Sequence, residues 1–194
     1  MNYLNKVCSF TGYRTPKLNA CLATNPNLNM EDVRRCLKSQ MLSKLEEDFT
    51  TFQCGMALGA DLMFAQIALE LREMYSAHLV KFVAVIPCLE HDKSWSQRER
   101  SLCRDLIRQA DETVLVSDCR YFDGCMAKRN QYLVKTCDEL LAVYDGQRGG
   151  TMQTVNFAKG KGIKVTVIDP SKSLIITLRE SIEETYRKER SILF

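Results

Sequence analysis

Short runs of apolar residues alternate along the chain with longer segments of helical periodicity. Several of these runs are apolar at consecutive positions rather than at every second one. A strand of that kind needs cover on both of its faces, as in a parallel sheet with flanking helices. The predicted strands are residues 6–10, 52–56, 80–86, 112–117, 139–145 and 164–169.

Segments with a helical pattern lie between these strands. Residues 60–75 have a broad apolar arc, which indicates a well-covered helix. A last helix is expected over about 171–190, starting after Pro170. Residues 14–29 lack a clear period and are expected to form a mobile loop over the sheet edge. The other predicted helices are 30–49, 96–110, 126–137 and 151–162.

The regular alternation of strand and helix predicts the fold class. It indicates an α/β protein, a Rossmann-like, doubly wound, mainly parallel sheet with helices on both faces. The 194 residues suffice for one domain with a real core and are too few for two. No repeat, low-complexity tract or long linker divides them, so a single domain over 1–194 is expected.

Composition says more about the cellular environment of the protein than about its function. The apolar content of 45% and the charged content of 26% are ordinary for a globular protein, and the net charge of +3 argues only weakly for nucleic acid. No signal peptide or spanning helix is recognised, so no membrane association is expected. The nine cysteines occur singly and without a Cys-x-x-Cys pair, which favours a reduced, cytoplasmic protein.

Neither a metal nor a resident cofactor is expected. The spacing Cys88-x-x-His91 resembles half of a zinc site, but the chain has only two histidines and no second ligand pair nearby. No Gly-Lys-Thr/Ser ending indicates a P-loop. No Gly-x-Gly-x-x-Gly follows the first strand, so a dinucleotide redox cofactor is not indicated either.

Chemically unusual residues follow the predicted strands rather than precede them. In open parallel sheets ligands bind beyond the carboxyl ends of the strands, where loops gather and helix amino termini point. The candidate ligand-binding residues, in chain order after strands one to five, are Thr11, Gly12, Arg14, Gly55, Gly59, Asp61, Trp95, Arg129, Asn130, Asp145, Gly149, Gly150 and Thr151.

Each of these residues also has a plain structural explanation. Gly55 and Gly59 could let a helix start close to the sheet, and Arg14 could be an ordinary surface residue. Trp95 could fill the core, since leucines follow it at helical spacing, or stack on a base.

The pair Gly149-Gly150 and the following Thr151 carry the strongest signal. A glycine pair between a strand and a helix leaves bare N–H groups at the positive end of the helix dipole, where a phosphate is stabilised. Thr151 could cap that helix or donate its hydroxyl to the same anion.

Taken together, these motifs resemble the YpsA-like branch of the SLOG superfamily, named after the DNA-processing protein DprA (Smf) and the LOG phosphoribohydrolases. The resemblance covers roughly residues 7–168 and implies a Rossmann-like fold with a nucleotide-derived ligand over the carboxyl edge of the sheet. It rests on the order of TGYR (11–14), GMALGAD (55–61), Ile-Pro (86–87) with Trp95, Ala-Asp (110–111), MAKRN (126–130) and YDGQRGGTMQT (144–154).

The resemblance to LOG enzymes also shows a departure. Arg129 matches the arginine of their Met-x-x-Arg helix, and residues 149–151 match their phosphate loop, which is one residue shorter here. Where those enzymes place a glutamate that assists cleavage of the N-glycosidic bond, this chain has Thr154, which cannot act as a carboxylate.

Other carboxylates stay candidates for chemistry. They are Asp61, Asp123 and Asp145, and Asp145 is the best placed of them, at a strand end. It could assist bond cleavage, but the role of holding a ribose hydroxyl is preferred.

Three functions therefore stay open, with no catalytic residue assigned. The first is a non-catalytic sensor or regulatory module that binds a nucleotide-like small molecule. The second is a phosphoribohydrolase-like N-glycosidase that uses Arg129 and Asp145. The third, ranked last, is single-stranded nucleic-acid binding as in DprA-type proteins. A homodimer is compatible with the resemblance.

Overall fold

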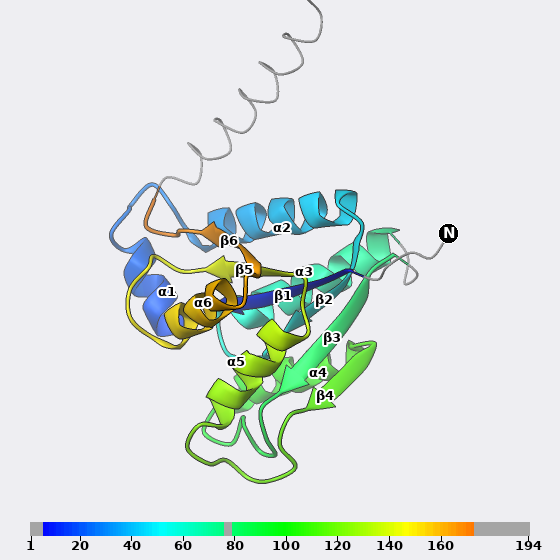
Figure 1. Cartoon of the computed structure of the whole chain (residues 1–194). Coiled ribbons are helices and arrows are strands. Elements are labelled where there is room, and N and C mark those ends of the chain that lie inside the picture. The colour runs from blue at the N-terminus through cyan, green and yellow to red at the C-terminus, as the bar shows by residue number, and fades with distance from the viewer. Residues whose placement is uncertain (1–5, 76–78, 173–194) are drawn as a thin grey trace, which may run out of the picture.

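The computed structural model describes residues 6–75 and 79–172, and its centre is one six-stranded sheet (Figure 1). All five pairings between neighbouring strands are parallel, and the strand order is β4-β3-β2-β1-β5-β6. The strands are β1 (Lys6–Gly12), β2 (Phe49–Cys54), β3 (Lys81–Ile86), β4 (Glu112–Leu115), β5 (Glu139–Val143) and β6 (Lys164–Ile168).

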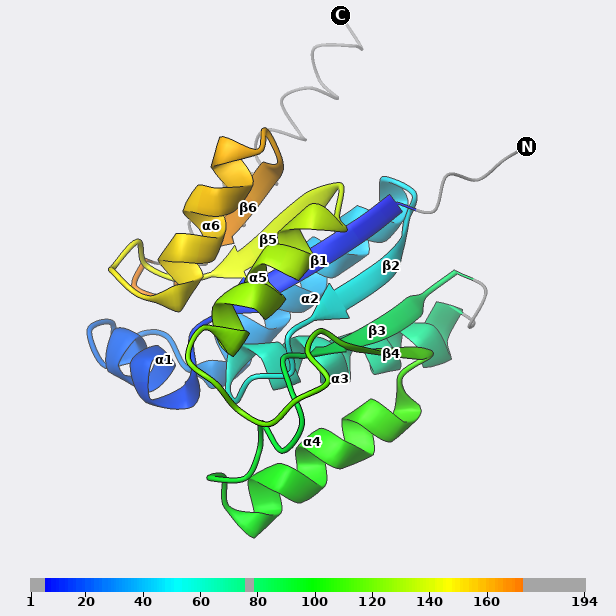
Figure 2. The same cartoon turned by 60° about the horizontal axis from the view of Figure 1, so that its bottom comes forward.

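Helices cover both faces of this sheet. Figure 2 shows α5 and α6 in front of the sheet and α2 and α3 behind it, while α4 packs against α3. The predicted Rossmann-like α/β class is therefore confirmed. The helices are α1 (Thr15–Leu22), α2 (Met30–Glu46), α3 (Ala60–Tyr75), α4 (Gln97–Gln109), α5 (Cys125–Lys135) and α6 (Gly150–Gly160).

The core explains why the strand runs are apolar at consecutive positions. All five residues of β5 are buried, because α5 and α6 cover one of its faces and the α2–α3 layer covers the other. The rings of Phe10 and Phe64 stack with centroids 4.6 Å apart where β1 meets α3. The edge strand β4 is largely exposed, so it has the weakest apolar pattern.

The structure corrects the expectation for residues 14–29. They do not form a mobile loop throughout, because residues 15–22 form α1, with a proline in the first turn. Leu18, Cys21 and Leu22 are buried and follow the i, i+3, i+4 spacing of an amphipathic helix. This helix is only eight residues long and lies among asparagines, threonines and prolines, so its apolar spacing gave only a weak helical signal in the sequence.

Several other boundaries differ from the prediction by a few residues. The helix expected over 30–49 ends at Glu46, and β2 begins at Phe49, three residues earlier than predicted. Asp48 adopts a left-handed φ of 67° and turns the chain between them. The helix expected over 171–190 lies, beyond Lys172, outside the described residues.

The strand order creates a topological switch point between β1 and β5. The chain proceeds outward from β1 through β2 and β3 to β4, and then returns to place β5 on the other side of β1. The connections after β1 and after β5 therefore diverge to opposite faces of the sheet. In open α/β sheets the crevice at this point, beyond the carboxyl ends of the strands, is where ligands bind.

Candidate functional site

A cleft of about 320 Å³ opens at the switch point, and most of the candidate residues line it. We call it the switch-point cleft. It is built from the connections that follow β1, β2, β4 and β5. Its lining residues are Thr11, Gly12, Tyr13, Arg14, Lys17, Ala57, Asp61, Met126, Arg129, Asn130, Gly149, Gly150 and Thr151.

The amino terminus of α6 at this cleft carries no side-chain cap. By contrast, Asn29 with Asp32 and Ser96 with Glu99 form complete capping boxes on α2 and α4. At α6 the capping position is Gly149, no acidic residue lies in the first turn, and no side chain bonds to the amides there. The first N–H groups of a helix have no acceptor within it, so these amides are available to an anion.

Space is also left in front of these amides. A Cβ atom on Gly150 would meet no heavy atom within 4 Å, and one on Gly149 would lie 3.5 Å from Nζ of Lys17. The glycine pair therefore keeps a surface of bare backbone open beside a cationic side chain.

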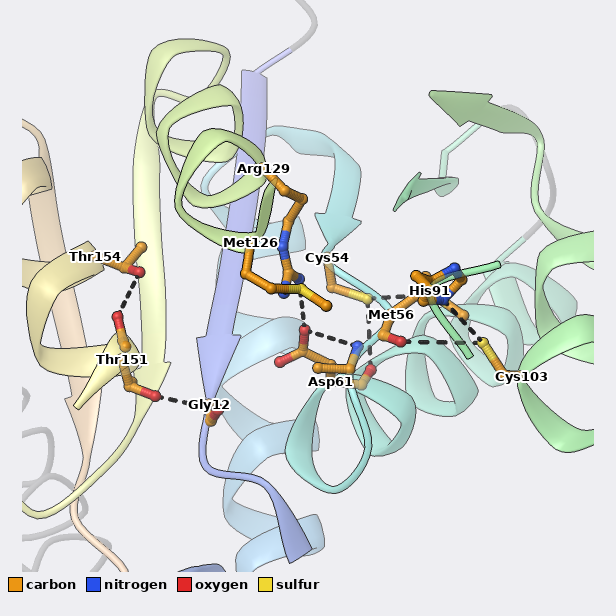
Figure 3. A network of polar contacts seen from close by, with 12 residues as sticks. Gly12, Cys54, Met56, Asp61, His91, Cys103, Met126, Arg129, Thr151 and Thr154 are labelled. Carbon is orange, nitrogen blue, oxygen red and sulfur yellow. Dashed lines mark hydrogen bonds and ion pairs between the residues drawn. The ribbon is translucent and has the colours of Figure 1, made fainter. Parts of the chain in front are cut away.

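The two threonine hydroxyls of α6 serve the fold. Thr151 Oγ1 donates to the carbonyl oxygen of Gly12 at 3.2 Å and fixes α6 to the end of β1 (Figure 3). Thr154 Oγ1 donates to the carbonyl oxygen of Gly150 at 2.8 Å. Each hydroxyl has a single proton, so in this arrangement neither donates it to a ligand.

Arg129 on α5 and Asp61 on α3 form a buried ion pair across the cleft floor (Figure 3). Nη1 of Arg129 lies 3.2 Å from Oδ2 of Asp61, and the two side chains are only 6% and 5% exposed. Burial raises the pKa of Asp61, although the Arg129 guanidinium and the Ala57 N–H oppose that rise. Nη2 of Arg129 donates, within the described residues, to the sulfur of Met126 at 3.9 Å, a weak acceptor that leaves it donor capacity.

The predicted glycines after the first two strands explain how α3, α5 and the loop after β1 come so close. A Cβ on Gly55 would fall 0.9 Å from Nη1 of Arg129, so a side chain there would displace the guanidinium. Gly59 has a left-handed φ of 92°, and its Cα faces the backbone of residues 13–15. A Cβ on Gly12 would lie 2.5 Å from that of Ala60. Gly55 and Gly59 thus shape the site without lining the cleft.

Asp145 is not among the residues that line the cleft. Its carboxylate accepts hydrogen bonds from the Tyr13 hydroxyl and, at 3.0 Å, from the backbone N–H of Gln147. The Cys21 thiol lies 3.5 Å from its other oxygen. Burial acts to raise the pKa of Asp145, but these hydrogen bonds outweigh it and hold the pKa below its usual value. In this arrangement Asp145 anchors α1 and the turn after β5.

Trp95 belongs to a second, adjoining cleft of about 490 Å³. We call it the aromatic cleft. Arg14 and Met126 line both clefts, so the two share a wall. The sequence did not single out the aromatic cleft. Its lining residues are Arg14, Glu90, His91, Lys93, Ser94, Trp95, Arg120, Tyr121 and Met126.

A larger groove of about 690 Å³ runs over α2, α3 and α4. Its charged lining residues are one arginine, Arg34, and three glutamates, Glu70, Glu73 and Glu99. The negative balance makes this groove a poor site for a phosphate, in spite of its size.

The Cys88-x-x-His91 spacing does not form a metal centre in the described ranges, where no group of three or more potential ligands gathers. His91 is partly buried, and this burial lowers its pKa. Its Nε2 lies 4.0 Å from the sulfur of Cys103, and its ring meets Trp95 edge-on.

The fold and the cleft define this chain as a Rossmann-like protein with a ligand-sized hollow at its switch point. The family model YpsA, described as the "YspA SLOG family", matches residues 8–172. The chain therefore belongs to the YpsA SLOG family, as the sequence motifs indicated.

Relatives of similar length agree with this assignment. The chain is 27% identical over 159 residues to a UPF0398 protein of Bacillus cereus strain B4264, covering 81% of this chain and 84% of that protein. It is 26% identical, with the same coverage, to a UPF0398 protein of Bacillus thuringiensis strain Al Hakam.

Two solved structures share the fold. DNA processing protein A of Streptococcus pneumoniae superposes with a TM-score of 0.58 at 16% identity, over 92% of this chain and 57% of that one. The chain thus spans little more than half of the pneumococcal protein. DNA processing protein A of Helicobacter pylori, whose structure concerns its single-stranded DNA binding mode, gives 0.55 at 14% identity, over 95% and 81%.

In the described residues, 6–75 and 79–172, no helix has both the length and the apolar character needed to span a bilayer.

Proposed function

We propose that this protein binds a nucleotide or nucleotide-derived ligand in the switch-point cleft and does not cleave it. The observation that carries the proposal is the uncapped amino terminus of α6, which presents bare amides into a cleft at the topological switch point. Arg14 and Lys17 add two cationic side chains to the lining, and no acidic residue forms an ion pair with either in the part of the chain that the structure describes.

The arrangement of carboxylates supports binding without catalysis. Asp61 is the carboxylate that lines the cleft in the described residues, and it is buried against Arg129. Thr154 stands at the LOG glutamate position, with its hydroxyl bonded within α6. Asp145 is held by Tyr13 outside the lining. Cleavage of an N-glycosidic bond needs a carboxylate or an equivalent proton donor beside the bond, and none of the three is free there.

The test uses Gly150→Asp, with Gly150→Ala as the matched control. A carboxylate at the first position of α6 interacts favourably with the helix dipole, worth about 0.3–1 kcal/mol, so the variant should fold at least as well as the parent. The same carboxylate would occupy the place proposed for the phosphate. The expected result is that Gly150→Asp abolishes nucleotide binding while Gly150→Ala retains most of it.

Binding is measured by thermal shift and calorimetry against the common nucleoside 5′-monophosphates and ADP-ribose. At a hundred times the dissociation constant a ligand adds about 2.7 kcal/mol, or roughly 5–10 °C for a chain of this size. A panel without any shift, or equal binding by both glycine variants, would refute the proposal. Release of free base from any of these probes by the parent protein would establish the hydrolase instead.

Single-stranded DNA is a second candidate, favoured by the fold shared with the two DNA processing proteins and by Arg14 and Lys17, which form no ion pair among the described residues. Fluorescence anisotropy with a labelled oligonucleotide tests it at low and rising salt. Affinity should fall steeply with salt if the backbone phosphates carry the binding. Absence of binding at low salt would remove this candidate.

A further inference from the structure

Among the described residues, the switch-point cleft offers little ring surface for a nucleobase. Tyr13 is the one aromatic residue of the described chain that lines it, and this residue is only 3% exposed. The Tyr13 hydroxyl is bonded to Asp145, and Nζ of Lys17 lies 4.3 Å from the centroid of its ring. A nucleotide bound there by its phosphate must therefore place its base elsewhere.

We propose that the aromatic cleft binds the base of the same ligand, so that one nucleotide spans both clefts. The inference rests on the proposed function, because it takes the phosphate to lie at the start of α6. The clefts adjoin at Arg14 and Met126, and a ligand that extends from one to the other passes these two side chains. The second cleft has about 490 Å³, within the usual range of small-molecule sites.

The walls of the aromatic cleft are held together by the fold. Leu89 and Arg120 form a parallel β-bridge, and the N–H of Leu89 donates to the carbonyl oxygen of Cys119 at 2.9 Å. The loop after β3 and the loop after β4 are therefore joined next to the cleft. Glu90, which lines it, has a left-handed φ of 55°, a conformation that non-glycine residues adopt mainly at constrained sites.

Two aromatic side chains line this cleft. Trp95 is partly buried and packs against the main hydrophobic core, so part of its ring serves the fold. The Trp95 ring is held edge-on to the His91 ring, with centroids 5.5 Å apart and planes at 85°. Tyr121, on the loop after β4, is 61% exposed, an unusual exposure for a large aromatic side chain. A ring held by its neighbours and an exposed ring in the same cleft are suited to contact a base, because stacking accepts any base.

The charges of the cleft favour an anionic ligand. Glu90 Oε2 lies 3.8 Å from Nζ of Lys93 and 4.0 Å from Nε of Arg120, so one carboxylate faces two cations. Arg14 adds a third cation at the shared wall. Burial lowers the pKa of His91 and so favours its neutral form. The excess positive charge beside the aromatic rings matches a base that is attached to a phosphate.

Trp95 is the single tryptophan of the chain, so its fluorescence reports directly on this cleft. The probes are the monophosphate panel and ADP-ribose, with ribose 5-phosphate as the matched compound without a base. Base-bearing probes that bind should change the Trp95 emission. Ribose 5-phosphate should bind more weakly and leave the emission unchanged.

The variant Tyr121→Ala should weaken the base-bearing probe by at least about fivefold and leave ribose 5-phosphate unaffected. Tyr75→Ala is the matched control, because Tyr75 is an exposed tyrosine at the carboxyl end of α3, outside both clefts. Unfolding midpoints of both variants verify that the fold is intact, as expected for exposed side chains.

The outcomes separate the two proposals. If a nucleotide binds and Gly150→Asp abolishes the binding, but Trp95 emission and Tyr121→Ala have no effect, the inference is wrong and the proposed function stands. An equal change of emission with ribose 5-phosphate would also overturn the inference. If no probe binds, both fail.

Discussion

The buried ion pair between Arg129 and Asp61 allows a quantitative test of how the site is built. Replacing Arg129 by methionine keeps an elongated apolar side chain and removes the guanidinium. Asp61 would then be a buried carboxylate without its partner. Breaking a buried pair in this way costs about 3–5 kcal/mol. The N–H of Ala57, which donates to Asp61 at 3.2 Å, stays in place, so we expect about 3 kcal/mol.

The loss of stability should depend on pH, and the direction of this dependence follows from the pKa of Asp61. Burial already raises the pKa of Asp61 in the parent protein, and removal of Arg129 takes away the main opposing influence. The folded variant therefore binds a proton more readily than the unfolded chain. Its stability relative to the parent should recover as pH falls through the raised pKa toward the ordinary carboxyl value near 4. We expect the loss to be largest at pH 8 and clearly smaller at pH 5.

Urea unfolding of both proteins at each pH measures the effect, and the double variant Asp61→Asn/Arg129→Met is measured beside them. The double variant should recover much of the loss, because it removes both charges together. Arg108→Met is the matched control. Arg108 pairs with Asp105 on the exposed face of α4, where such a pair contributes at most about 1 kcal/mol. A loss below about 1 kcal/mol for Arg129→Met, or one independent of pH, would refute the reasoning.

Three more predictions address the surroundings of the site. Tyr13→Phe should cost about 1.5–3 kcal/mol at pH 7, because it removes a bond to the charged Asp145; urea titrations should show the loss vanishing as pH falls through the depressed pKa of that carboxyl. Lys44→Met should cost about 1.5–3 kcal/mol, because it removes a buried partner 2.6 Å from Glu139 at the opposite end of the sheet, while Nζ of Lys164 stays 2.6 Å from the other carboxylate oxygen; calorimetry should find nucleotide affinity unchanged. Cys119 is the exposed one of the nine cysteines, and burial raises the pKa of seven of the others. A thiol reagent should therefore label about one thiol rapidly, and a fast phase that persists in Cys119→Ser would contradict this.

The consecutive apolar positions of the strands predicted a parallel sheet with two covered faces, and all five strand pairings are parallel. The pattern did not reveal α1, since eight residues give barely two turns of periodicity. The placement of glycines directly after strands was equally informative. Gly12, Gly149 and Gly150 line one cleft, as a shared carboxyl edge requires.

The roles of individual side chains were harder to predict. The sequence suggested that Thr151 could donate to an anion, but its hydroxyl is bonded to Gly12. Asp145 was the preferred ribose ligand, and its carboxylate is held by Tyr13 outside the cleft lining. These bonds join residues more than a hundred positions apart, which no local pattern reports.

By itself, then, the sequence predicted a parallel sheet with two covered faces and, through its resemblance to LOG enzymes, a threonine at position 154 where those enzymes place a glutamate. These properties depend on residue type and on local periodicity. The tertiary structure alone decided that Gly55 makes room for Arg129, that Arg129 pairs with Asp61, and that a bridge between Leu89 and Arg120 joins two loops beside a second cleft. Those features arise where the strand order brings distant loops together. The contacts between these loops determine which side chains become partners.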